Sequence, residues 1–525
     1  MPTLVIDGES LRIEELWRAV TEPGWQLELS PRARQRIEQG RAWVERWLQE
    51  QRQVYGVTTG FGELAAVPIS ASQARELQIH LVRSHSVGAG EWLPCEVSRA
   101  MLLLRANVLA RGYSGVRPAV VDSLIALFNS GLVPAIPRQG SVGASGDLVQ
   151  LAHLALALIG EGFFRTENGI EPAATVLQRH GLAPLQLEAK EGLALINGTQ
   201  MTTAYGALSV YRAWQCALIA DVAAALTADV LRASPTPYDA RLHSLRPFPG
   251  QQRTAARLRM LRAGSSLQHL PRPTPLPQDA YSLRCIPQVH GASHDAIAYV
   301  WNVVQIELNA VTDNPIVDLD SGQPIEGGNF HGQPLALALD FLALACAELA
   351  NISERRIERL LNSRTSGLPA FLAAKPGLHS GLMIAQYTAA SIVSENKVLC
   401  HPASVDSIPT SAGQEDHNSM ASIAAQKVWQ VVENLQTVLA LELLCAAQAL
   451  EYLRPSRSSS RLERLVECIR DHVPPLQEDR PLYRDVELLR SLITSGELLA
   501  AALPESVGDY PTSHDLPIPN IMPAQ

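Results

Sequence analysis

The sequence has no pair of cysteines at the CxxC spacing that marks many metal and redox sites. It contains seven cysteines, and an odd number cannot pair completely into disulfides within one chain. They are Cys95, Cys216, Cys285, Cys346, Cys400, Cys445 and Cys468. We therefore expect reduced, mostly buried thiols in a cytoplasmic protein, and we expect no metal site.

Basic clusters and targeting segments are missing as well. No block of Lys and Arg stands out in a chain of formal net charge -9, so the charge pattern does not favour a nucleic-acid partner. Residues 1–17 have neither a basic start nor an apolar core, which argues against a secretory signal peptide. The most apolar stretches, such as residues 334–352, contain Asp340 and Glu348, which a bilayer-spanning helix tolerates poorly. We expect no membrane partner.

What is present is a long and strongly helical chain. Its 525 residues are 46% hydrophobic and 18% charged, which is typical of a globular protein with a large core. The pair Ser30-Pro31 predicts the start of a helix that runs to about residue 50, and Pro118 predicts the start of another. Residues 333–362 and about 414–453 predict two much longer helices.

The predicted helix at 414–453 has apolar residues on more than one face. They include Val428, Val431, Val432, Leu435, Val438, Leu439 and Leu441. Such a helix lies inside a bundle or between subunits. Strand signals are few, and the clearest predicts a small hairpin around Asn168-Gly169. No repeat of solenoid period is evident, which weakens the alternative that the chain is a helical scaffold.

Three segments interrupt the helical pattern. Residues 55–65 are rich in Gly and Thr, residues 133–147 contain several glycines, and residues 264–282 contain closely spaced prolines that preclude a helix. Loops that rigid helices hold in place often carry the chemistry of a protein. These three segments are therefore the ones in which we expect catalytic residues.

The triplet Ala144-Ser145-Gly146 allows two interpretations. In the first, residues 140–146 form a turn and Asp147 caps a buried helix. In the second, a tight bend lets the amide nitrogen of Gly146 attack the carbonyl carbon of Ala144, and loss of water closes a five-membered ring. Loss of a second water from Ser145 then leaves an exocyclic methylidene, an electrophile that no standard side chain supplies. A phosphate-binding loop fits poorly, because no Gly-Lys-Ser/Thr follows.

Eight sequence blocks occur in order along the chain. They are YGVTTGFG (55–62), SHSVGAG (84–90), GSVGASGDL (140–148), EGLALINGTQ (191–200), YSLRCIPQ (281–288), ELNAVTDNP (307–315), GGNFHGQP (327–334) and QEDHNSM (414–420). Over about residues 50–455 the chain thereby resembles the aromatic amino-acid ammonia-lyase and aminomutase family. Members carry a methylidene-imidazolone, so the resemblance implies this group at Ala144, Ser145 and Gly146, with no diffusible cofactor.

The resemblance also implies a fold and an assembly. The fold is mainly α-helical, a long-helix bundle of the histidine ammonia-lyase type with a smaller mixed N-terminal portion. We expect residues 1–230 to carry the prosthetic-group loop, and residues 231–525 to form the central helical bundle and the C-terminal helices. Family members are homotetramers whose active sites combine residues from three subunits, so we expect a homotetramer that binds a small amino-acid substrate.

Two residues are implied to act beside the prosthetic group. Tyr55 matches the base that removes the weakly acidic β-proton, and a tyrosine pKa near 10 requires a site that favours the phenolate. Asn197 matches a residue that orients the prosthetic group or the substrate amine. Without the resemblance, Tyr55 would be read as a turn tyrosine and Asn197 as part of an Asn-Gly turn.

Four more residues are implied to complete the substrate pocket. Arg284 matches the clamp for the substrate carboxylate, for which a guanidinium fork is well shaped. Gln278, Tyr281 and Phe330 are expected around it. Without the resemblance, Arg284 would be read as a surface or ion-paired arginine, and Phe330 as ordinary core packing.

Two positions bear on the aromatic ring of the substrate. His85 matches the family's selectivity position, where histidine, tyrosine and some aminomutase types carry histidine; this argues against phenylalanine. Glu415 lies in a Gln-Glu-Asp-His block that is typical of histidine types, whereas tyrosine and phenylalanine types have Asn-Gln-Asp. A carboxylate can accept a hydrogen bond from an imidazole N–H. The alternative for Glu415 is a helix N-terminal glutamate that interacts with the dipole.

We therefore expect an ammonia-lyase that eliminates ammonia from L-histidine to give urocanate. A tyrosine ammonia-lyase or a tyrosine 2,3-aminomutase of the same family stays open as an alternative. A helical scaffold protein would explain the bundle but not the loops rich in Gly, Ser and Tyr. An aspartase- or fumarase-like lyase needs a GSSxMPxKxN-type loop, which the sequence lacks.

The expected modification of residues 144–146 changes the mass of the chain and can be measured directly. Intact-mass spectrometry of active protein should show a deficit of two waters, and peptide mapping should localise it to these residues. The Ser145→Ala variant, which has no hydroxyl to lose, serves as the control and should not show the double deficit. An unmodified mass in active protein would contradict the expectation.

Overall fold

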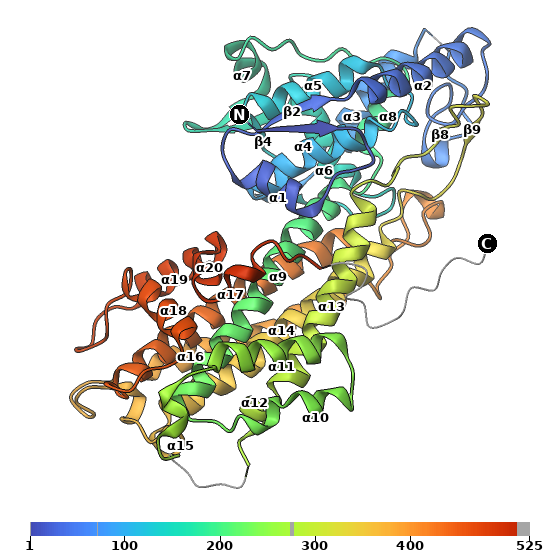
Figure 1. The fold of residues 1–525 in the computed structure, drawn as a ribbon. Coiled ribbons are helices and arrows are strands. Elements are labelled where there is room, and N and C mark those ends of the chain that lie inside the picture. Colours follow the sequence, from blue (N-terminus) through green and yellow to red (C-terminus); the bar gives the residue numbers. More distant parts are fainter. Residues whose placement is uncertain (1, 71, 273–277, 512–525) are drawn as a thin grey trace. The chain divides into compact units, whose positions relative to one another are not determined.

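The computed structural model of the chain describes residues 2–70, 72–272 and 278–511. It contains two compact units, both mainly helical (Figure 1), which confirms the predicted fold class. The first unit comprises Met1–Leu208, Val303–Leu339 and Pro402–Gln426, and the second comprises Ser209–Asn302, Asp340–His401 and Lys427–Gln525. The expected organisation into residues 1–230 and 231–525 is a division along the sequence and stays a prediction. Within the expected loop 264–282, residues 273–277 lie outside the described residues.

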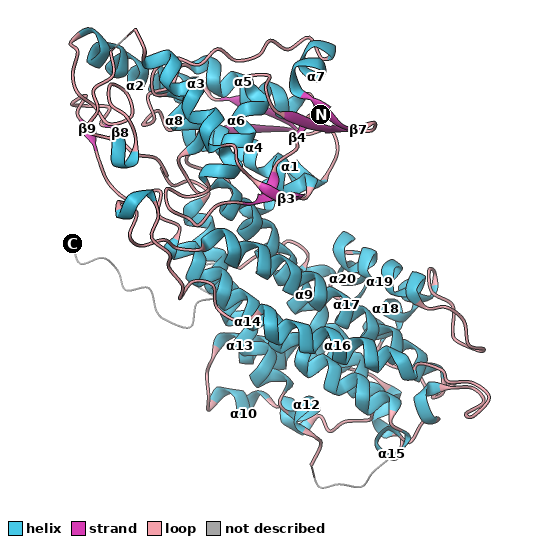
Figure 2. Cartoon of the chain, turned by 180° about the vertical axis from the view of Figure 1, so that it is seen from behind, coloured by secondary structure: helices cyan, strands magenta, loops and turns pink. Residues whose placement is uncertain are grey.

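Short helices and small sheets make up the first unit. Its helices are α1 (Ile13–Thr21), α2 (Pro31–Gln49), α3 (Ala74–His85), α4 (Cys95–Leu109), α5 (Pro118–Asn129), α6 (Leu148–Leu158), α7 (Ala173–Arg179) and α8 (Glu191–Ile196). Its strands are β1 (Thr3–Ile6), β2 (Gln26–Leu29), β3 (Ala89–Trp92), β4 (Val133–Pro134), β5 (Pro137–Gln139), β6 (Phe163–Thr166), β7 (Gly169–Pro172), β8 (Ile316–Val317) and β9 (Pro324–Ile325). All strands of the described residues belong to this unit (Figure 2).

The sheets of the first unit are small, with two or three strands each. Strands β1 and β2 are parallel, β3 pairs with β5, β8 pairs with β9, and β4, β6 and β7 form an antiparallel sheet. The hairpin predicted around Asn168-Gly169 is present, since Thr166 pairs with Gly169 at the turn between β6 and β7. The mixed character expected near the N-terminus is therefore confirmed by the fold.

The sequence signals for the two shorter helices are also confirmed. Ser30 lies at the N-cap of α2, where its hydroxyl accepts a hydrogen bond from the amide of Ala33 at 3.1 Å, and Pro31 occupies the first turn. Pro118 opens α5 in the same way. A proline loses nothing at the start of a helix, because its missing N–H would have no intrahelical acceptor there.

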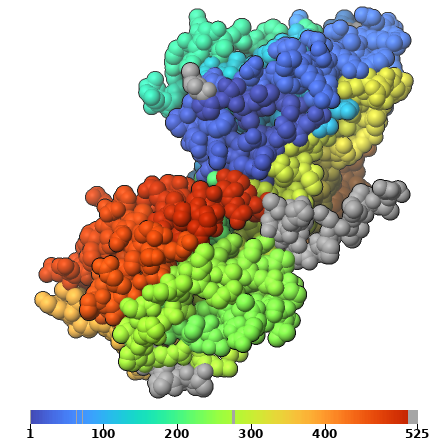
Figure 3. All heavy atoms as spheres, in the orientation of Figure 1, coloured from blue at the N-terminus to red at the C-terminus, as the bar shows by residue number. Residues whose placement is uncertain are grey.

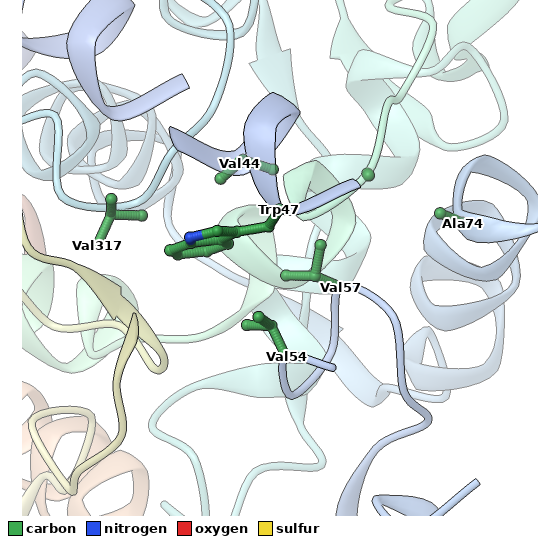
Figure 4. Close-up of a cluster of buried hydrophobic side chains, with 7 residues drawn as sticks. Val44, Trp47, Val54, Val57, Ala74 and Val317 are labelled. Carbon is green, nitrogen blue, oxygen red and sulfur yellow. The ribbon is translucent and has the colours of Figure 1, made fainter. Parts of the chain in front are cut away.

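A buried apolar cluster anchors the loop that follows α2 (Figure 4). Trp47 at the end of α2 is 1% exposed, and its indole Nε1 donates to the carbonyl of Gly322 at 2.9 Å. Val54 and Val57 of the loop are buried with it, and Val317 of β8 lies on the opposite side. Because these two valines flank Tyr55 in sequence, the cluster fixes where the loop holds that tyrosine.

Helices alone form the second unit, apart from connecting loops. Those that lie wholly within it are α10 (Ala240–Ser244), α11 (Pro249–Arg262), α12 (Tyr281–Arg284), α15 (Ser363–Ser366), α16 (Met383–Leu399), α18 (Ser460–Arg470), α19 (Tyr483–Ser495) and α20 (Glu497–Ala502). Helix α18 packs on α11 and α20. The surface of this unit therefore combines the green middle of the chain with its red C-terminal helices (Figure 3).

Four long helices contribute residues to both units: α9 (Gln200–Val230), α13 (Ile286–Glu307), α14 (Gln333–Leu361) and α17 (Ala421–Glu451). The predicted helix 333–362 is confirmed by α14. The predicted start of the other long helix at about residue 414 is wrong, because α17 begins at Ala421. Ser411 and Ala412 have positive φ angles of 51° and 53°, which a right-handed helix does not allow.

A buried carboxylate connects three of these helices inside the second unit. Glu442 of α17 accepts from Arg356 of α14 at 2.6 and 2.8 Å. Its oxygens also accept from Thr227 of α9 at 2.8 Å and from Ser353 of α14 at 2.6 Å. An ion pair removed from water is tolerated only when further hydrogen bonds satisfy its polar atoms, as they do here.

By length and composition alone, two helices in the described part of the chain could cross a membrane, α9 and α14. A core helix passes the same test. The apolar window of α9 is 100% buried and that of α14 is 67% buried. Asp340 in α14 pairs with Lys427 at 2.9 Å, so the charge noted in the sequence has a polar partner.

Candidate active site

A cavity of about 1010 Å³ lies in the first unit. Six of the residues expected at the site line it: Tyr55, His85, Ser145, Asn197, Phe330 and Glu415. They come from the loop after α2, from the turn before α6, from the ends of α3 and α8, and from the segments before α14 and α17. Residues far apart in the sequence thus meet around one space.

The loop before α6 is bent at its glycines. Gly143 and Gly146 have φ angles of +75° and +77°, a region that residues with a side chain rarely adopt. Ser141 spans the bend, since its hydroxyl donates to the carbonyl of Gly146 at 2.8 Å and accepts from the amide of Gly143 at 3.1 Å. The bend presents Ser145 to the cavity.

The same loop docks on the turn after α8. The amide of Gly198 donates to the carbonyl of Ser145 at 3.2 Å, and the amide of Asp147 donates to the carbonyl of Gly198 at 2.7 Å. A Cβ atom placed on Gly146 would lie 2.0 Å from the carbonyl oxygen of Gly198. Only glycine therefore fits at position 146, and the triplet is held against the segment that carries Asn197.

Asp147 does not cap α6 with its side chain, although it lies at the N-cap position. Its carboxylate instead accepts from the amide and the hydroxyl of Thr202, both at 2.8 Å, in the first turn of α9. Burial raises the pKa of Asp147 to about 6, although these hydrogen bonds act to lower it. The carboxylate thus ties the loop to α9 rather than to its own helix.

Asn197 lies at the C-terminal end of α8 and is 2% exposed. Its Nδ2 donates to the carbonyl of Asn314 at 2.9 Å, while its Oδ1 has no hydrogen-bond donor within the described residues. The segment of Asn314 is held by the buried pair of Lys190 and Asp313, whose atoms are 2.9 Å apart. A buried acceptor beside a cavity suits an incoming N–H donor, because leaving it unpaired is costly.

Tyr55 lies in the loop anchored by the Trp47 cluster. Its hydroxyl oxygen accepts a hydrogen bond from the amide of Gly62 at 3.1 Å, and its ring packs edge-on against Phe61 with centroids 6.2 Å apart. Burial raises the pKa of Tyr55, and the carboxylates of Glu415 and Glu326 raise it further, whereas the bond from Gly62 lowers it. The Gly62 amide is thus the one of these influences that stabilises a phenolate.

His85 is the last residue of α3 and lines the cavity, and one of its two ring nitrogens is already hydrogen-bonded within the helix. Its Nδ1 lies 2.9 Å from the carbonyl of Leu81, which can only accept, so the proton is assigned to Nδ1 and Nε2 is left as an acceptor. Burial lowers the pKa of His85, although Leu81 and the nearby Glu415 act in the opposite direction. The contact with Leu81 therefore satisfies one ring nitrogen of His85 and leaves the other available.

Glu415 does not lie in a helix. It closes a tight turn in which Thr410 and Glu415 pair through their backbones, and its Oε2 accepts a hydrogen bond from the Thr410 hydroxyl at 2.6 Å. The alternative explanation through a helix dipole is wrong, because α17 begins six residues later. The turn directs Glu415 to the cavity that contains Tyr55 and His85.

Gln278, Tyr281 and Arg284 lie in the second unit and do not line this cavity. They form a cluster of their own at α12. Arg284 donates to Gln278 at 2.6 Å, and its guanidinium lies 4.5 Å from the centre of the Tyr281 ring, which is exposed. Their part in the site stays a prediction.

Other residues at the cavity did not emerge from the sequence as candidates. Asn314, Glu326, Ser411 and Gln414 line it as well. Asn314 and Gln414 belong to two of the sequence blocks, so the blocks contained the signal without revealing the role. Ser411 and Thr410, which holds Glu415, precede the last block.

Comparison with known proteins identifies the family. The profile of the family described as aromatic amino acid lyase matches residues 11–471. A histidine ammonia-lyase of Symbiobacterium thermophilum is 54% identical over 92% of this chain and 95% of its own length. The crystal structure of histidine ammonia-lyase from Trypanosoma cruzi has a TM-score of 0.89 and 46% identity, and covers 96% of this chain and 95% of that one.

A further structure, the tyrosine aminomutase from Streptomyces globisporus, has a TM-score of 0.89 at 38% identity and covers 96% of this chain and 99% of that one. The resemblance found in the sequence blocks is thereby confirmed. Because the family profile spans most of the chain, the protein belongs to the aromatic amino acid lyase family.

Proposed function

We propose that this protein is a carbon–nitrogen lyase that eliminates ammonia from L-histidine and releases urocanate. The observation that carries the proposal is a single cavity in which Glu415 lies together with Ser145 and Tyr55. The relatives named histidine ammonia-lyase, at 54% and 46% identity, support histidine as the substrate. We propose a small amino acid as the only partner besides copies of the chain.

The loop before α6 fits a methylidene-imidazolone made from Ala144, Ser145 and Gly146. The backbone is bent at Gly146, Gly198 leaves no space for a Cβ there, and Ser145 faces the cavity. Such a group would supply an electrophilic methylidene carbon, so that no diffusible cofactor is needed. Asn197 offers its unpaired Oδ1 beside this loop, where it can accept a hydrogen bond from the substrate ammonium.

Elimination takes a proton from the β-carbon and ammonia from the α-carbon, so that a double bond forms between them. We propose that the phenolate oxygen of Tyr55 is the base that takes this proton. The Gly62 amide donates to this oxygen and stabilises its negative charge. The Trp47 cluster holds the loop, so that Tyr55 keeps its place while the proton moves.

Glu415 and His85 recognise the aromatic ring of the substrate. The carboxylate of Glu415 accepts a hydrogen bond from an imidazole N–H, and Nε2 of His85 offers a second acceptor in the same cavity. Phe330 packs against the ring as an apolar wall. A phenol could use His85 but would leave Glu415 without a donor, which disfavours tyrosine.

We place the protein in the cytoplasm as a homotetramer in which Gln278, Tyr281 and Arg284 come to the cavity from another subunit. Arg284 binds the substrate carboxylate there. The second unit supports an assembly, because large apolar side chains are exposed on α14 and α16. They include Phe341, Leu344, Ile384 and Tyr387. Exposed apolar surface of this kind is typical of subunit contacts.

A substrate panel tests the proposal. L-histidine should give urocanate, L-tyrosine and L-phenylalanine should give little acrylate product, and no β-amino acid should appear. Glu415→Gln should lower kcat/KM for histidine by roughly tenfold or more, since the imidazole N–H of the substrate would lose its charged partner. The difference in kcat/KM between histidine and tyrosine should narrow as a result. Glu326→Gln, a matched change in the same cavity, should keep the preference for histidine. A wild type that prefers tyrosine would refute the ring argument and make His85 the partner of the phenol.

The pH dependence tests Tyr55 as the base. Because the phenolate is the active form, kcat/KM should rise with pH toward the raised pKa of Tyr55. Glu326→Gln removes a negative charge that disfavours the phenolate, so it should lower this pKa and move the ascending limb to lower pH. The control is Glu167→Gln on the exposed β6–β7 turn. An ascending limb that stays in place, or moves to higher pH, would count against Tyr55.

Mixed subunits test whether Arg284 acts from a neighbouring chain. Tyr55→Phe and Arg284→Ala should each be nearly inactive alone, the first through turnover and the second through substrate binding. Co-expressed in equal amounts, they should regain up to about a quarter of the activity, because some cavities receive both native residues from different chains. Co-expression of Tyr55→Phe with the double variant is the control. No recovery from the first mixture would show that the two residues do not act across subunits.

A further inference from the structure

The turn that carries Glu415 has an unusual backbone. Ser411, Ala412 and Gly413 follow one another with φ angles of 51°, 53° and 90°. A left-handed conformation is unfavourable for a residue with a side chain, so it persists only where the surroundings enforce it. Backbone bonds do so here, since Thr410 and Glu415 exchange hydrogen bonds at 3.0 and 3.3 Å. The turn therefore has a fixed shape that brings residue 415 back beside residue 410.

The buried side-chain amide of Asn418 holds this turn in place. Asn418 is fully buried, and its Nδ2 donates to the carbonyl of Ile408 at 2.6 Å. The same nitrogen lies 3.3 Å from the hydroxyl oxygen of Thr410 and 3.4 Å from the carbonyl of Glu415. An amide NH₂ can only donate, so Thr410 accepts on its oxygen from Asn418.

The hydroxyl of Thr410 consequently has one direction left for its own proton. That direction is Oε2 of Glu415, which lies 2.6 Å away. A hydroxyl that donates to a carboxylate forms one of the stronger hydrogen bonds in proteins. It occupies Oε2 and leaves Oε1 for a second donor, and Glu415 lines the cavity.

We propose that Thr410 is a positioning residue for substrate recognition, whose hydroxyl holds Glu415 so that its other carboxylate oxygen meets the ring N–H of the substrate. This inference rests on the proposed function, in which Glu415 binds the ring. Thr410 does not line the cavity and acts only through Glu415. A long glutamate side chain loses considerable rotational freedom when it binds, and the Thr410 hydroxyl removes part of that loss in advance.

A merely structural role for Thr410 gives a different expectation. Thr410 also pairs with Glu415 through its backbone, and this pairing does not need the hydroxyl. If the residue only shaped the turn, Thr410→Val, which keeps the branched side chain, would behave like the wild type or would lower stability without regard to Glu415. The two roles therefore separate in a cycle that includes both residues.

The experiment measures kcat/KM for L-histidine in Thr410→Val, Thr410→Ser, Glu415→Gln and the double variant Thr410→Val/Glu415→Gln, with melting temperatures alongside. Thr410→Val should lower kcat/KM about tenfold or more, as the loss of one hydrogen bond to a charged group implies, mainly through KM. Thr410→Ser, which keeps the hydroxyl, should stay within about threefold of the wild type. In the Glu415→Gln background, the valine change should cost less than about twofold.

Each outcome decides one question. If Glu415→Gln itself leaves kcat/KM unchanged, the proposed ring recognition fails. If Glu415→Gln is impaired and the valine change multiplies the loss by the same factor in both backgrounds, the role of Thr410 is overturned while the proposed function stands. Should Thr410→Val not fold, Thr410→Ala, which only removes atoms, takes its place in the same cycle.

Discussion

The backbone of Gly146 runs beside the backbone of Gly198, and the arrangement of the site depends on how closely the two approach. A Cβ atom on Gly146 would lie 2.0 Å from the carbonyl oxygen of Gly198, and one on Gly198 would lie 2.6 Å from that of Thr312. Neither position can carry a side chain. The contact therefore places Ser145 and Asn197, each the residue before one of these glycines, at the same cavity.

The other side of the cavity depends on two loops that touch. Residues 62–64 and 411–413 each form a tight turn, and these turns are in contact. A Cβ atom on Gly62 would lie 2.6 Å from the hydroxyl oxygen of Ser411. The loop of Tyr55 and the turn of Glu415 are thus fitted to each other, so that a shift in one displaces the other.

Much of the fold follows from local signals in the sequence. Ser30-Pro31 and Pro118 begin helices because a cap and a proline fit the first turn, and the hairpin at Asn168-Gly169 forms because that pair suits a tight turn. Tyr55, Ser145 and Glu415 belong to sequence blocks whose spacing alone does not indicate that they converge in the fold. Local patterns also could not place Arg284, whose only close partners in the described residues lie at α12.

The features that the sequence concealed are non-local or depend on backbone conformation. Asp147 occupies a capping position, yet its carboxylate bonds to Thr202 of another helix, which only the tertiary fold can bring near. The segment 414–420 contains no Pro or Gly to stop a helix, but the left-handed Ser411 and Ala412 and the pairing of Thr410 with Glu415 delay the helix to Ala421. Propensity here yields to hydrogen bonds between residues that the chain folds together.

The pairing of Gly146 with Gly198 also has a consequence for the order of events during synthesis. About fifty residues separate the two glycines, and the segment of Gly198 is braced by Asp313 and Asn314, which are made much later. A nascent chain that has been synthesised as far as Gly198 but not as far as residue 313 lacks these supports. We therefore expect any covalent change that needs this bend to occur only in the folded chain, so that a truncated or misfolded copy carries no reactive group.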